Sequence, residues 1–207
     1  MSERFPTRAA KARQTRRRIL DAAIRLFTEA GYPATTIAAI ASDGGVAVQT
    51  VYATFQTKRA VLAEAIDLAI AGDDEPIPVN ERPWMLPVWQ ATDGPSTVRA
   101  YAAAVRLIQG RVAPLFRALD VAAAVEPELV ELWEQTRQRR RLGAGGVTRV
   151  AAERTPLRPH LSVELATDIA WSLNSHEVYL NLVDGCGWTP AAYETWLGDT
   201  LAEQLFG

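Results

Sequence analysis

The sequence predicts an all-α protein with a small amino-terminal helical domain and a larger carboxy-terminal one. In most segments apolar residues recur three and four positions apart, which is the spacing of one buried helix face. No segment shows the regular two-residue alternation that is typical of a half-buried strand. A stretch with five prolines, residues 72–95, separates the two helical regions and is expected to be a connection.

Charge is distributed unevenly along the 207 residues. Residues 1–60 hold ten Lys and Arg against four acids, a net charge of +6, and the remaining residues carry −8. A basic front favours a polyanion-binding module, with a solvated basic tail as the alternative. The single cysteine, Cys186, fits a reducing compartment, and the opening residues lack the apolar stretch of a signal peptide. We therefore expect a cytoplasmic protein that does not enter the membrane.

Local signals divide the amino-terminal region into helices. Residues 1–13 are polar, basic and aperiodic, so we expect a flexible arm there, and the helical pattern starts at about Thr15. Gly31 is expected to end the first helix, because the proline two residues later blocks its continuation. Thr36 and Thr57 are suited to cap two later helices. These signals predict a compact helical domain over residues 14–71.

The uncharged segment "GVAVQTVYATF", residues 45–55, decides the fold of this domain. Its valines and threonines favour a strand by propensity, but neither face of that strand would be polar, and nothing in the first 70 residues offers it a partner strand. As a helix, Ala47, Val51 and Phe55 stack on one face. Because Asp43-Gly44-Gly45 turns the chain just before it, we predict the second helix of a helix-turn-helix.

The carboxy-terminal region, residues 96–207, is predicted to consist of long helices. Pro114 is expected to end the first of them, and Thr189 with Pro190 is expected to begin the last. The predicted helices cover about 96–112, 115–125, 126–153, 162–184 and the segment after Thr189.

Residues 15–70 resemble the DNA-binding domain of the tetracycline-repressor-like (TetR/AcrR) family. The matching blocks are "ILDAAIRLFTEAGY", "TTIAAIA", "GV" followed by "TVYATF", and "TKRAVL", and they occur in the family's order. The last two helices also resemble those of many members, whereas residues 72–160 match only in being helical. The resemblance implies a three-helix helix-turn-helix DNA-binding domain, followed by a helical domain for effector binding and dimerisation.

The resemblance also implies which residues contact the DNA backbone. Tyr52, Lys58 and Thr36 match backbone-contacting positions, and such contacts orient a protein without reading sequence. Arg16 and Arg17 can reach the backbone or the minor groove. The alternatives are an exposed aromatic residue at Tyr52 and a solvated helix start at the arginines.

Base reading is assigned by the resemblance to the start of the recognition helix. Gln49 can pair with adenine in the major groove, with a solvated side chain as the alternative. Val48 and Thr50 can meet a thymine methyl group, and Thr54 lies at the margin of this surface. The sequence departs from the family at Ala47, where a capping serine is common, and it has no arginine in the recognition helix.

Aromatic and polar residues of the second domain suggest a pocket for a small-molecule effector, because such sites are mostly apolar with a few polar groups. Core and dimer packing is the alternative for each of them. The basic run "RQRRR", residues 137–141, is predicted to be a solvated face, with attraction of an anionic effector as the alternative. The candidate pocket residues are Trp89, Tyr101, Gln109, Phe116, Trp133, Arg137, Trp171 and Asn174.

The last two predicted helices carry two apolar stripes, more than one layer of packing needs. The resemblance implies that they form a four-helix bundle with a second copy, and a two-fold dimer implies a near-palindromic operator. The residues expected in that interface are Leu180, Val183, Tyr193, Trp196, Leu197 and Leu201.

These features together predict a DNA-binding transcriptional regulator, most simply a repressor that a small molecule releases from double-stranded DNA. An effector-independent repressor or architectural DNA-binding protein is the first alternative, and a helical enzyme or binding module is the second. No catalytic motif supports an enzyme: His160 and His176 have no metal-ligand spacing, and phosphate and dinucleotide loops are missing. We therefore expect no cofactor and no metal.

Overall fold

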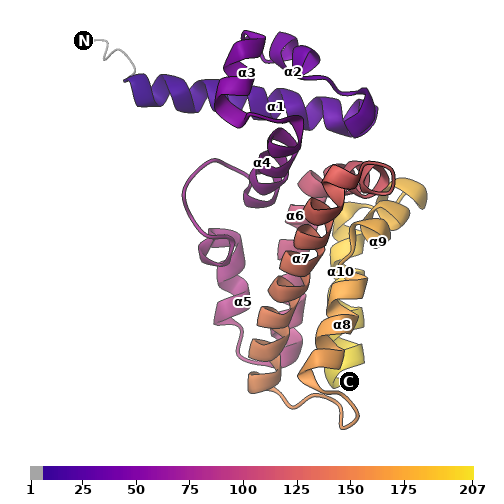
Figure 1. Ribbon diagram of the computed structural model, residues 1–207. Coiled ribbons are helices and arrows are strands. Elements are labelled where there is room, and N and C mark those ends of the chain that lie inside the picture. The colour runs from indigo at the N-terminus through magenta and orange to yellow at the C-terminus, as the bar shows by residue number, and fades with distance from the viewer. Residues whose placement is uncertain (1–6) are drawn as a thin grey trace.

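The computed structural model describes residues 7–207, and every regular element in that part of the chain is helical (Figure 1). This confirms the predicted all-α class. No helix among these residues has the length and apolarity needed to cross a membrane. The elements are α1 (Arg8–Ala34), α2 (Ile37–Asp43), α3 (Val48–Phe55), α4 (Lys58–Ala71), the 3-10 turns η1 (Val79–Glu81) and η2 (Pro83–Met85), α5 (Leu86–Gln90), α6 (Gly94–Ala123), α7 (Pro127–Arg154), α8 (Val163–Leu173), α9 (His176–Leu180), the π-helical turn η3 (Asn181–Gly185) and α10 (Pro190–Phe206).

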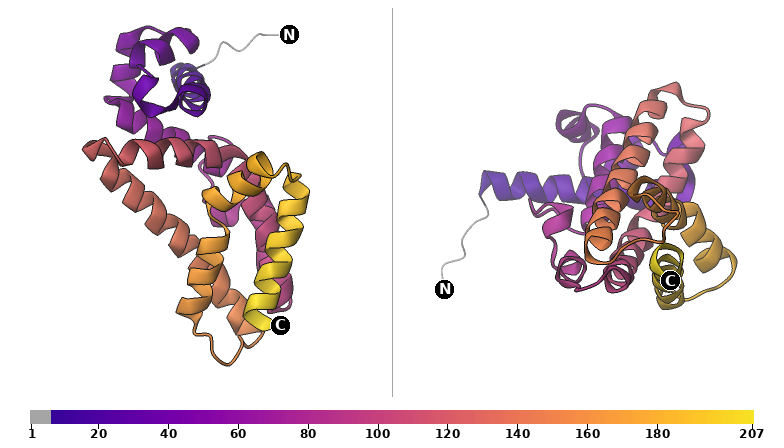
Figure 2. Two further views of the ribbon diagram at one scale, coloured as in Figure 1. Left: turned by 90° about the vertical axis from the view of Figure 1, so that its right-hand side faces the viewer. Right: turned by 90° about the horizontal axis from the view of Figure 1, so that it is seen from below.

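Helices α1 to α4 lie at one end of the molecule, and the carboxy terminus lies at the other, as the turned views in Figure 2 also show. The long helix α6 packs against α10 and α7 in the second domain. It also contacts α1 and α4, so it joins the two ends of the molecule.

The predicted helix boundaries of the first domain are largely confirmed. Gly31 has φ +76°, a conformation that favours glycine, and it interrupts α1 where the sequence predicted an end. The hydroxyl oxygens of Thr36 and Thr57 each accept a backbone N–H of the following helix. The disputed segment forms helix α3, with Val51 and Phe55 buried. Packing of these two side chains outweighs the weak helix propensity of the β-branched residues.

The flexible arm predicted for residues 1–13 is corrected in part. Helix α1 begins at Arg8, with the Thr7 hydroxyl accepting the Ala10 N–H at 3.2 Å, whereas residues 1–6 lie outside the described part. The start of the helix is held by Arg13, whose guanidinium pairs with Asp74 at 2.6 Å and Glu75 at 2.7 Å. These acids come from the connection, so the sequence near residue 13 gives no sign of them.

The core of the first domain is completed by residues of the second. Side chains from α1 to α4 form one buried cluster with the second half of α6 and the first turns of α7. Burial of apolar surface is the main stabilising term in folding, so the two domains depend on one another for stability. The residues that α6 and α7 contribute are Val112, Leu115, Phe116, Leu119, Ala122, Leu129 and Leu132.

Two predicted boundaries in the second domain are wrong. Helix α6 runs through Pro114, because the residues on both sides of it, including Ala113 and Leu115, are fully buried. That packing outweighs a proline penalty of about 3 kcal/mol. The predicted helix over 162–184 is broken at Asn174, where Ser175 caps a new short helix, α9.

The connection over residues 72–95 is organised around the buried side chain of Arg82. Its guanidinium pairs with Asp73 at 2.5 Å and donates to the backbone oxygens of Ile77 and Glu75 at 3.0 and 2.9 Å. The Arg82 side chain is 97% buried, and each of its three guanidinium nitrogens donates a hydrogen bond to the connection. Because other conformations of the loop would leave this buried charge without partners, few are available.

Replacement of Arg82 by Ala is therefore expected to loosen the connection. A protease that cuts after glutamate would cleave at Glu75 and Glu81 at least several-fold faster than in the wild type, because local opening exposes these bonds. The rate of fragment formation, followed by mass spectrometry, measures the effect. Arg99→Ala, which removes an exposed arginine, is the control, and equal cleavage of both variants would contradict the role given to Arg82.

Candidate functional site

The exposed face of α3 is held in place by its buried face. Val51 and Phe55 anchor the helix in the core, while Tyr52 remains 51% exposed and Val48 36% exposed. Gln49 is also exposed and Thr50 is half-buried. The first turn has no side-chain cap. The Thr50 N–H donates to the Ala47 carbonyl oxygen at 2.9 Å, and the N–H groups of Val48 and Gln49 remain available as hydrogen-bond donors. The arrangement presents an uncharged, hydrogen-bonding surface on a fixed helix.

Three of the expected contact groups form bonds within the chain. The Thr36 hydroxyl caps α2, and the Thr54 hydroxyl donates to the Thr50 carbonyl oxygen at 2.7 Å. The Lys58 ammonium donates to the Tyr32 carbonyl oxygen at 3.0 Å and lies 3.9 Å from the centre of the Tyr32 ring. A phosphate contact by Lys58 therefore requires its side chain to leave this position.

A hollow of about 500 Å³ lies between the start of α1 and α3. It brings Arg16, Thr50 and Thr54 together, three of the residues expected to contact DNA. Lys11 and Thr15 also line it and were not among the predicted contact residues, Lys11 because it falls in the segment expected to be a flexible arm. Their i, i+4 spacing on one helix face is the signal that would have found them.

The arginines of α1 are paired with acids. Arg16 forms an ion pair with Glu64 and lies over the Phe55 ring, 4.8 Å from its centre, and Arg17 pairs with Asp21 at 2.8 Å. These pairs are substantially exposed, and exposed ion pairs contribute about 0–1 kcal/mol. A phosphate can therefore replace the carboxylates at small cost.

A second group of functional candidates is a buried polar cluster inside the second domain. Tyr101, Gln109 and Asn174, all expected in the pocket, meet there. The Asn174 amide donates to the Tyr101 hydroxyl oxygen at 2.6 Å, and the Gln109 amide donates to the Asn174 backbone oxygen at 2.6 Å. Arg140 joins them, donating to the Asn174 side-chain oxygen at 3.2 Å. We call these four residues the buried polar cluster.

Aromatic residues border the cluster. Phe116 and Trp133, both expected in the pocket, lie edge-on to the ring of His176 with centroid distances of 5.8 and 5.7 Å. The Arg137 guanidinium lies 5.6 Å from the centre of the Trp171 ring on α8. Phe116 and Trp133 also pack in the core that the two domains share.

Burial controls the ionisation of this region. It lowers the pKa of His176 from its ordinary value of 6.5, with Arg140 and Arg117 acting in the same direction and the carboxylates of Glu177 and Asp120 opposing them. Burial also raises the pKa of the Tyr101 phenol to about 12. Both side chains are therefore neutral near pH 7.

The structure corrects several of the expected positions. Trp89 lies on α5, where its indole N–H donates to the Asn80 backbone oxygen, so it belongs to the connection. Within the basic run, Arg140 points inward and is not part of a solvated face. Arg140 lies four residues from both Thr136 and Ala144, which are buried, so all three residues share the inward face of α7. This spacing is the signal that Arg140 is not on a solvated face.

The expected dimer interface also changes. Tyr193, Leu197 and Leu201 are fully buried within one chain, because their four-residue spacing places them on the face of α10 that covers α6. Leu180 is buried as well, so Val183 and Trp196, both half-buried, are the remaining candidates. Leu165 on the adjacent α8 is also an exposed apolar side chain, at 52%.

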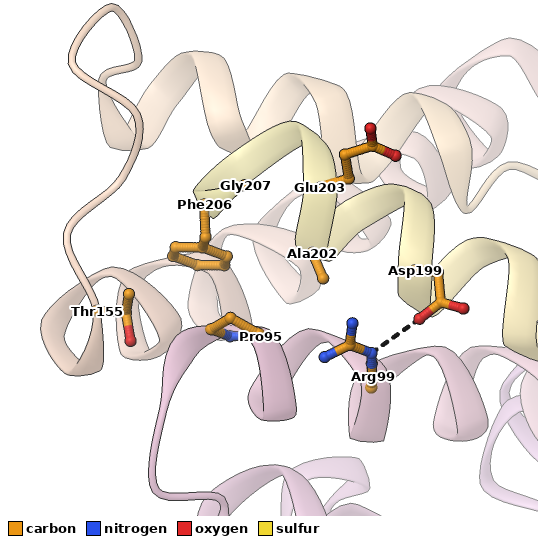
Figure 3. Close-up of a pocket in the computed structure, with 8 residues that line it drawn as sticks. All are labelled: Pro95, Arg99, Thr155, Asp199, Ala202, Glu203, Phe206 and Gly207. Carbon is orange, nitrogen blue, oxygen red and sulfur yellow. Dashed lines mark hydrogen bonds and ion pairs between the residues drawn. The ribbon is translucent and has the colours of Figure 1, made fainter.

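A hollow of about 440 Å³ at the carboxy-terminal end of α10 contains none of the expected pocket residues (Figure 3). Pro95 and Phe206 form its apolar side, and the Arg99 guanidinium that borders it already pairs with Asp199 at 2.9 Å. No buried polar group points to a ligand there.

One group of potential metal ligands occurs in the described chain. Asp120, His176 and Glu177 have ligand atoms within 4.8 Å of one another. The start of α9 and the nearby Arg140 place positive potential there, which opposes a bound cation.

Polar contacts connect the two domains next to the aromatic residues. The Tyr32 hydroxyl donates to the Glu128 carboxylate at 2.8 Å, from the core of the first domain to the first turn of α7. The Arg111 guanidinium donates to the backbone oxygens of Ala69 and Ile70 at the end of α4, at 2.8 and 2.9 Å. A change in the position of α6 or α7 is therefore transmitted to α1 and α4.

Comparison with known proteins agrees with this geometry. Residues 19–65 match the model of a family described as bacterial regulatory proteins, tetR family. The uncharacterized HTH-type transcriptional regulator YdeS of Bacillus subtilis is 28% identical over 159 residues, which cover 76% of this chain and 74% of that protein.

Solved structures share the fold across both domains. The transcriptional regulator FadR from Bacillus subtilis, in complex with stearoyl-CoA, has a TM-score of 0.68 at 17% identity and covers 91% of this chain and 98% of its own. A putative transcriptional regulator from Saccharomonospora viridis, in complex with choline, has a TM-score of 0.67 at 17% identity, covering 93% and 97%.

The buried His176 leads to a prediction about pH. Because its pKa is lowered in the folded state, the unfolded chain binds the proton more readily, and this histidine reduces stability as the pH falls below about 6.5. The loss of unfolding free energy between about pH 7.5 and about pH 5.5 should be smaller in His176→Gln than in the wild type. Urea unfolding at both pH values measures it, with His160→Gln as the matched control. An equal loss in His176→Gln and the wild type would refute the assignment.

Proposed function

We propose that the chain is a helix-turn-helix transcriptional regulator of the TetR family, and that it acts as a cytoplasmic repressor that a small-molecule effector releases from its operator. The observation that carries this proposal is the uncharged, exposed surface of α3. Val51 and Phe55 are buried on the opposite face of this helix, and the domain around it matches the family model. Val48, Gln49 and Thr50 would read bases, with Tyr52 bound to a phosphate.

The remaining DNA contacts would come from groups around α3. Thr36, Lys58 and the N–H groups of Val48 and Gln49 at the start of α3 are proposed to bind phosphates. Arg16 and Arg17 would exchange their carboxylate partners for the DNA backbone, with Thr54 at the edge of the contact. Lys11, which lines the hollow between α1 and α3, is added to this set.

The effector site is proposed to be the buried polar cluster and the aromatic residues around it. Phe116 and Trp133 support this assignment, because they contact His176 next to the cluster and also pack in the core of the DNA-binding domain. A ligand that displaces either ring moves the surface on which α1 and α4 rest. Coupling of this kind weakens DNA binding typically by about 1–3 kcal/mol, and reciprocity requires DNA to weaken effector binding equally.

A homodimer is proposed to place two copies of α3 on a near-palindromic operator, about 34–36 Å apart. Three side chains support an interface formed by the outer faces of α8 and α10. They are the exposed Leu165 on α8 and the half-buried Val183 on η3 and Trp196 on α10.

Specific binding is tested by fluorescence anisotropy with DNA from upstream of the protein's own gene, and with a duplex chosen by selection from random sequences. A scrambled duplex of equal composition is the control. A repressor should prefer its site by at least about 10³-fold at physiological salt. Equal affinity for all duplexes would leave only non-specific electrostatic binding and would reject the proposal.

Two substitutions on α3 should separate base reading from backbone binding. Tyr52→Phe should weaken binding to every duplex by about 1.5–3 kcal/mol, because it removes one hydrogen bond to a charged phosphate. Gln49→Ala should instead reduce the discrimination at one base pair by about 1–3 kcal/mol and change non-specific affinity little. Anisotropy with single-base operator variants distinguishes the two patterns, and unchanged affinity in both variants would refute the predicted docking.

A further inference from the structure

The buried polar cluster contains an arginine that lacks an acidic partner. Arg137, Arg139 and Arg141, its neighbours in the basic run, each pair with a carboxylate. Arg140 forms no ion pair with any residue of the described chain; its guanidinium donates only to Asn174 and lies 5.7 Å from the centre of the Phe116 ring. The Glu177 carboxylate acts on this guanidinium only from beyond ion-pair distance. A largely buried guanidinium that lacks a direct ion pair is unfavourable unless a bound anion provides one.

The groups around this guanidinium are also incompletely bonded. In the described part of the chain, the Tyr193 hydroxyl, His176 Nδ1 and the side-chain oxygen of Gln109 are buried and have no hydrogen-bond partner. Each of these three residues is at least 97% buried. Nδ1 of His176 lies 3.0 Å from a Glu177 oxygen but without hydrogen-bond geometry. Buried polar groups are normally paired, so a concentration of unpaired groups at one place indicates a candidate binding site.

Contacts place the unpaired groups near Arg140. Gln109 and Arg140 both donate to the Asn174 backbone oxygen, and the Phe116 ring lies 5.7 Å from the Arg140 guanidinium and 5.8 Å from the His176 ring.

Tyr101 and Arg140 are close enough to Tyr193 for their charges to influence its ionisation, and burial raises the pKa of the Tyr193 phenol. Tyr193 therefore keeps its proton and can donate it, as can the Tyr101 hydroxyl, whose oxygen accepts from Asn174. The guanidinium and the two phenols therefore provide donors close to the aromatic ring of Phe116.

We propose that the effector is a monocarboxylate with an apolar body, bound through its carboxylate to Arg140 and Tyr193. A single guanidinium balances one negative charge, and its planar fork matches a carboxylate in two parallel hydrogen bonds. The apolar body would lie against Phe116 and Trp133. This inference rests on the proposed function, since it gives the chemical class of ligand for the same site.

The fold alone does not determine the chemical class of the effector. The two solved relatives are in complex with choline, a cation, and with stearoyl-CoA, which carries phosphates. The assignment therefore depends on the charge of this chain's own residues. A phosphate dianion would need a second unpaired cation within the cluster. Arg137 is held by Glu134 and Trp171, and Arg117, which influences His176, is an exposed side chain outside the cluster.

The test measures direct binding to the full chain in the absence of DNA. The probes are benzoate, phenylacetate and octanoate, each compared with its primary amide, and phenylphosphonate as the dianion. Tryptophan fluorescence and titration calorimetry report binding. At least one carboxylate should bind about tenfold more tightly than its amide and than phenylphosphonate.

Substitutions in the basic run test whether Arg140 causes the preference for a carboxylate over its amide. Arg140→Gln should abolish the difference between carboxylate and amide, and Arg140→Lys, which keeps the charge but not the fork, should retain part of it. Arg139→Gln, which removes the adjacent and 68% exposed arginine, should bind as the wild type does. Circular dichroism establishes that each variant is folded. If Arg140→Gln does not fold, the binding preference is tested with Arg140→Lys alone.

The outcomes separate this inference from the proposed function. If every carboxylate binds no better than its amide, or if the preference survives both Arg140 variants, the inference is overturned, whatever the protein does with DNA. If a carboxylate binds through Arg140 but does not release a selected operator, the anion site stands and effector-released repression fails.

Discussion

The hydrophobic core that the two domains share is the constraint on which the rest of the structure depends. Helices α1 to α4 do not enclose their own interior; the second half of α6 and the first turns of α7 complete it. Protein interiors are close-packed and transmit displacements, so the position of α6 sets the position of the DNA-facing helices. Phe116 lies in that core and also touches His176 beside the buried polar cluster, so the proposed effector site is one side chain away from the DNA-binding domain.

Features set by local chemistry could be predicted from the sequence. Gly31 interrupts α1 because it takes a positive φ, and Thr36, Thr57 and Thr189 cap helices through their own hydroxyls within three residues. The assignment of α3 as a helix needed only the spacing of its buried residues. Tyr101, Gln109 and Asn174 were selected only as aromatic and polar residues of a helical region, and the hydrogen bonds that join them depend on the tertiary structure.

Features set by distant residues could not be predicted. Helix α6 continues through Pro114 because burial on both sides outweighs the local penalty, and α1 extends to Arg8 with help from acids more than 60 positions away. An apolar stripe on a helix does not identify the surface that packs against it. Leu197 and Leu201 were therefore assigned to an interface with a second chain, whereas α6 of the same chain covers them. Among the similar side chains of the basic run, only the register of α7 distinguishes Arg140.

The pairing of the α1 arginines with acids has a consequence for the thermodynamics of complex formation. Affinity for DNA comes largely from the release of cations condensed on the phosphates. When Arg16 leaves Glu64, the freed carboxylate gathers cations of its own, which offsets part of that release. The number of arginines near α3 therefore overstates the net ion release, and the acids of the protein moderate its attraction to arbitrary DNA. Specificity then depends more on the uncharged surface of α3 than on total charge.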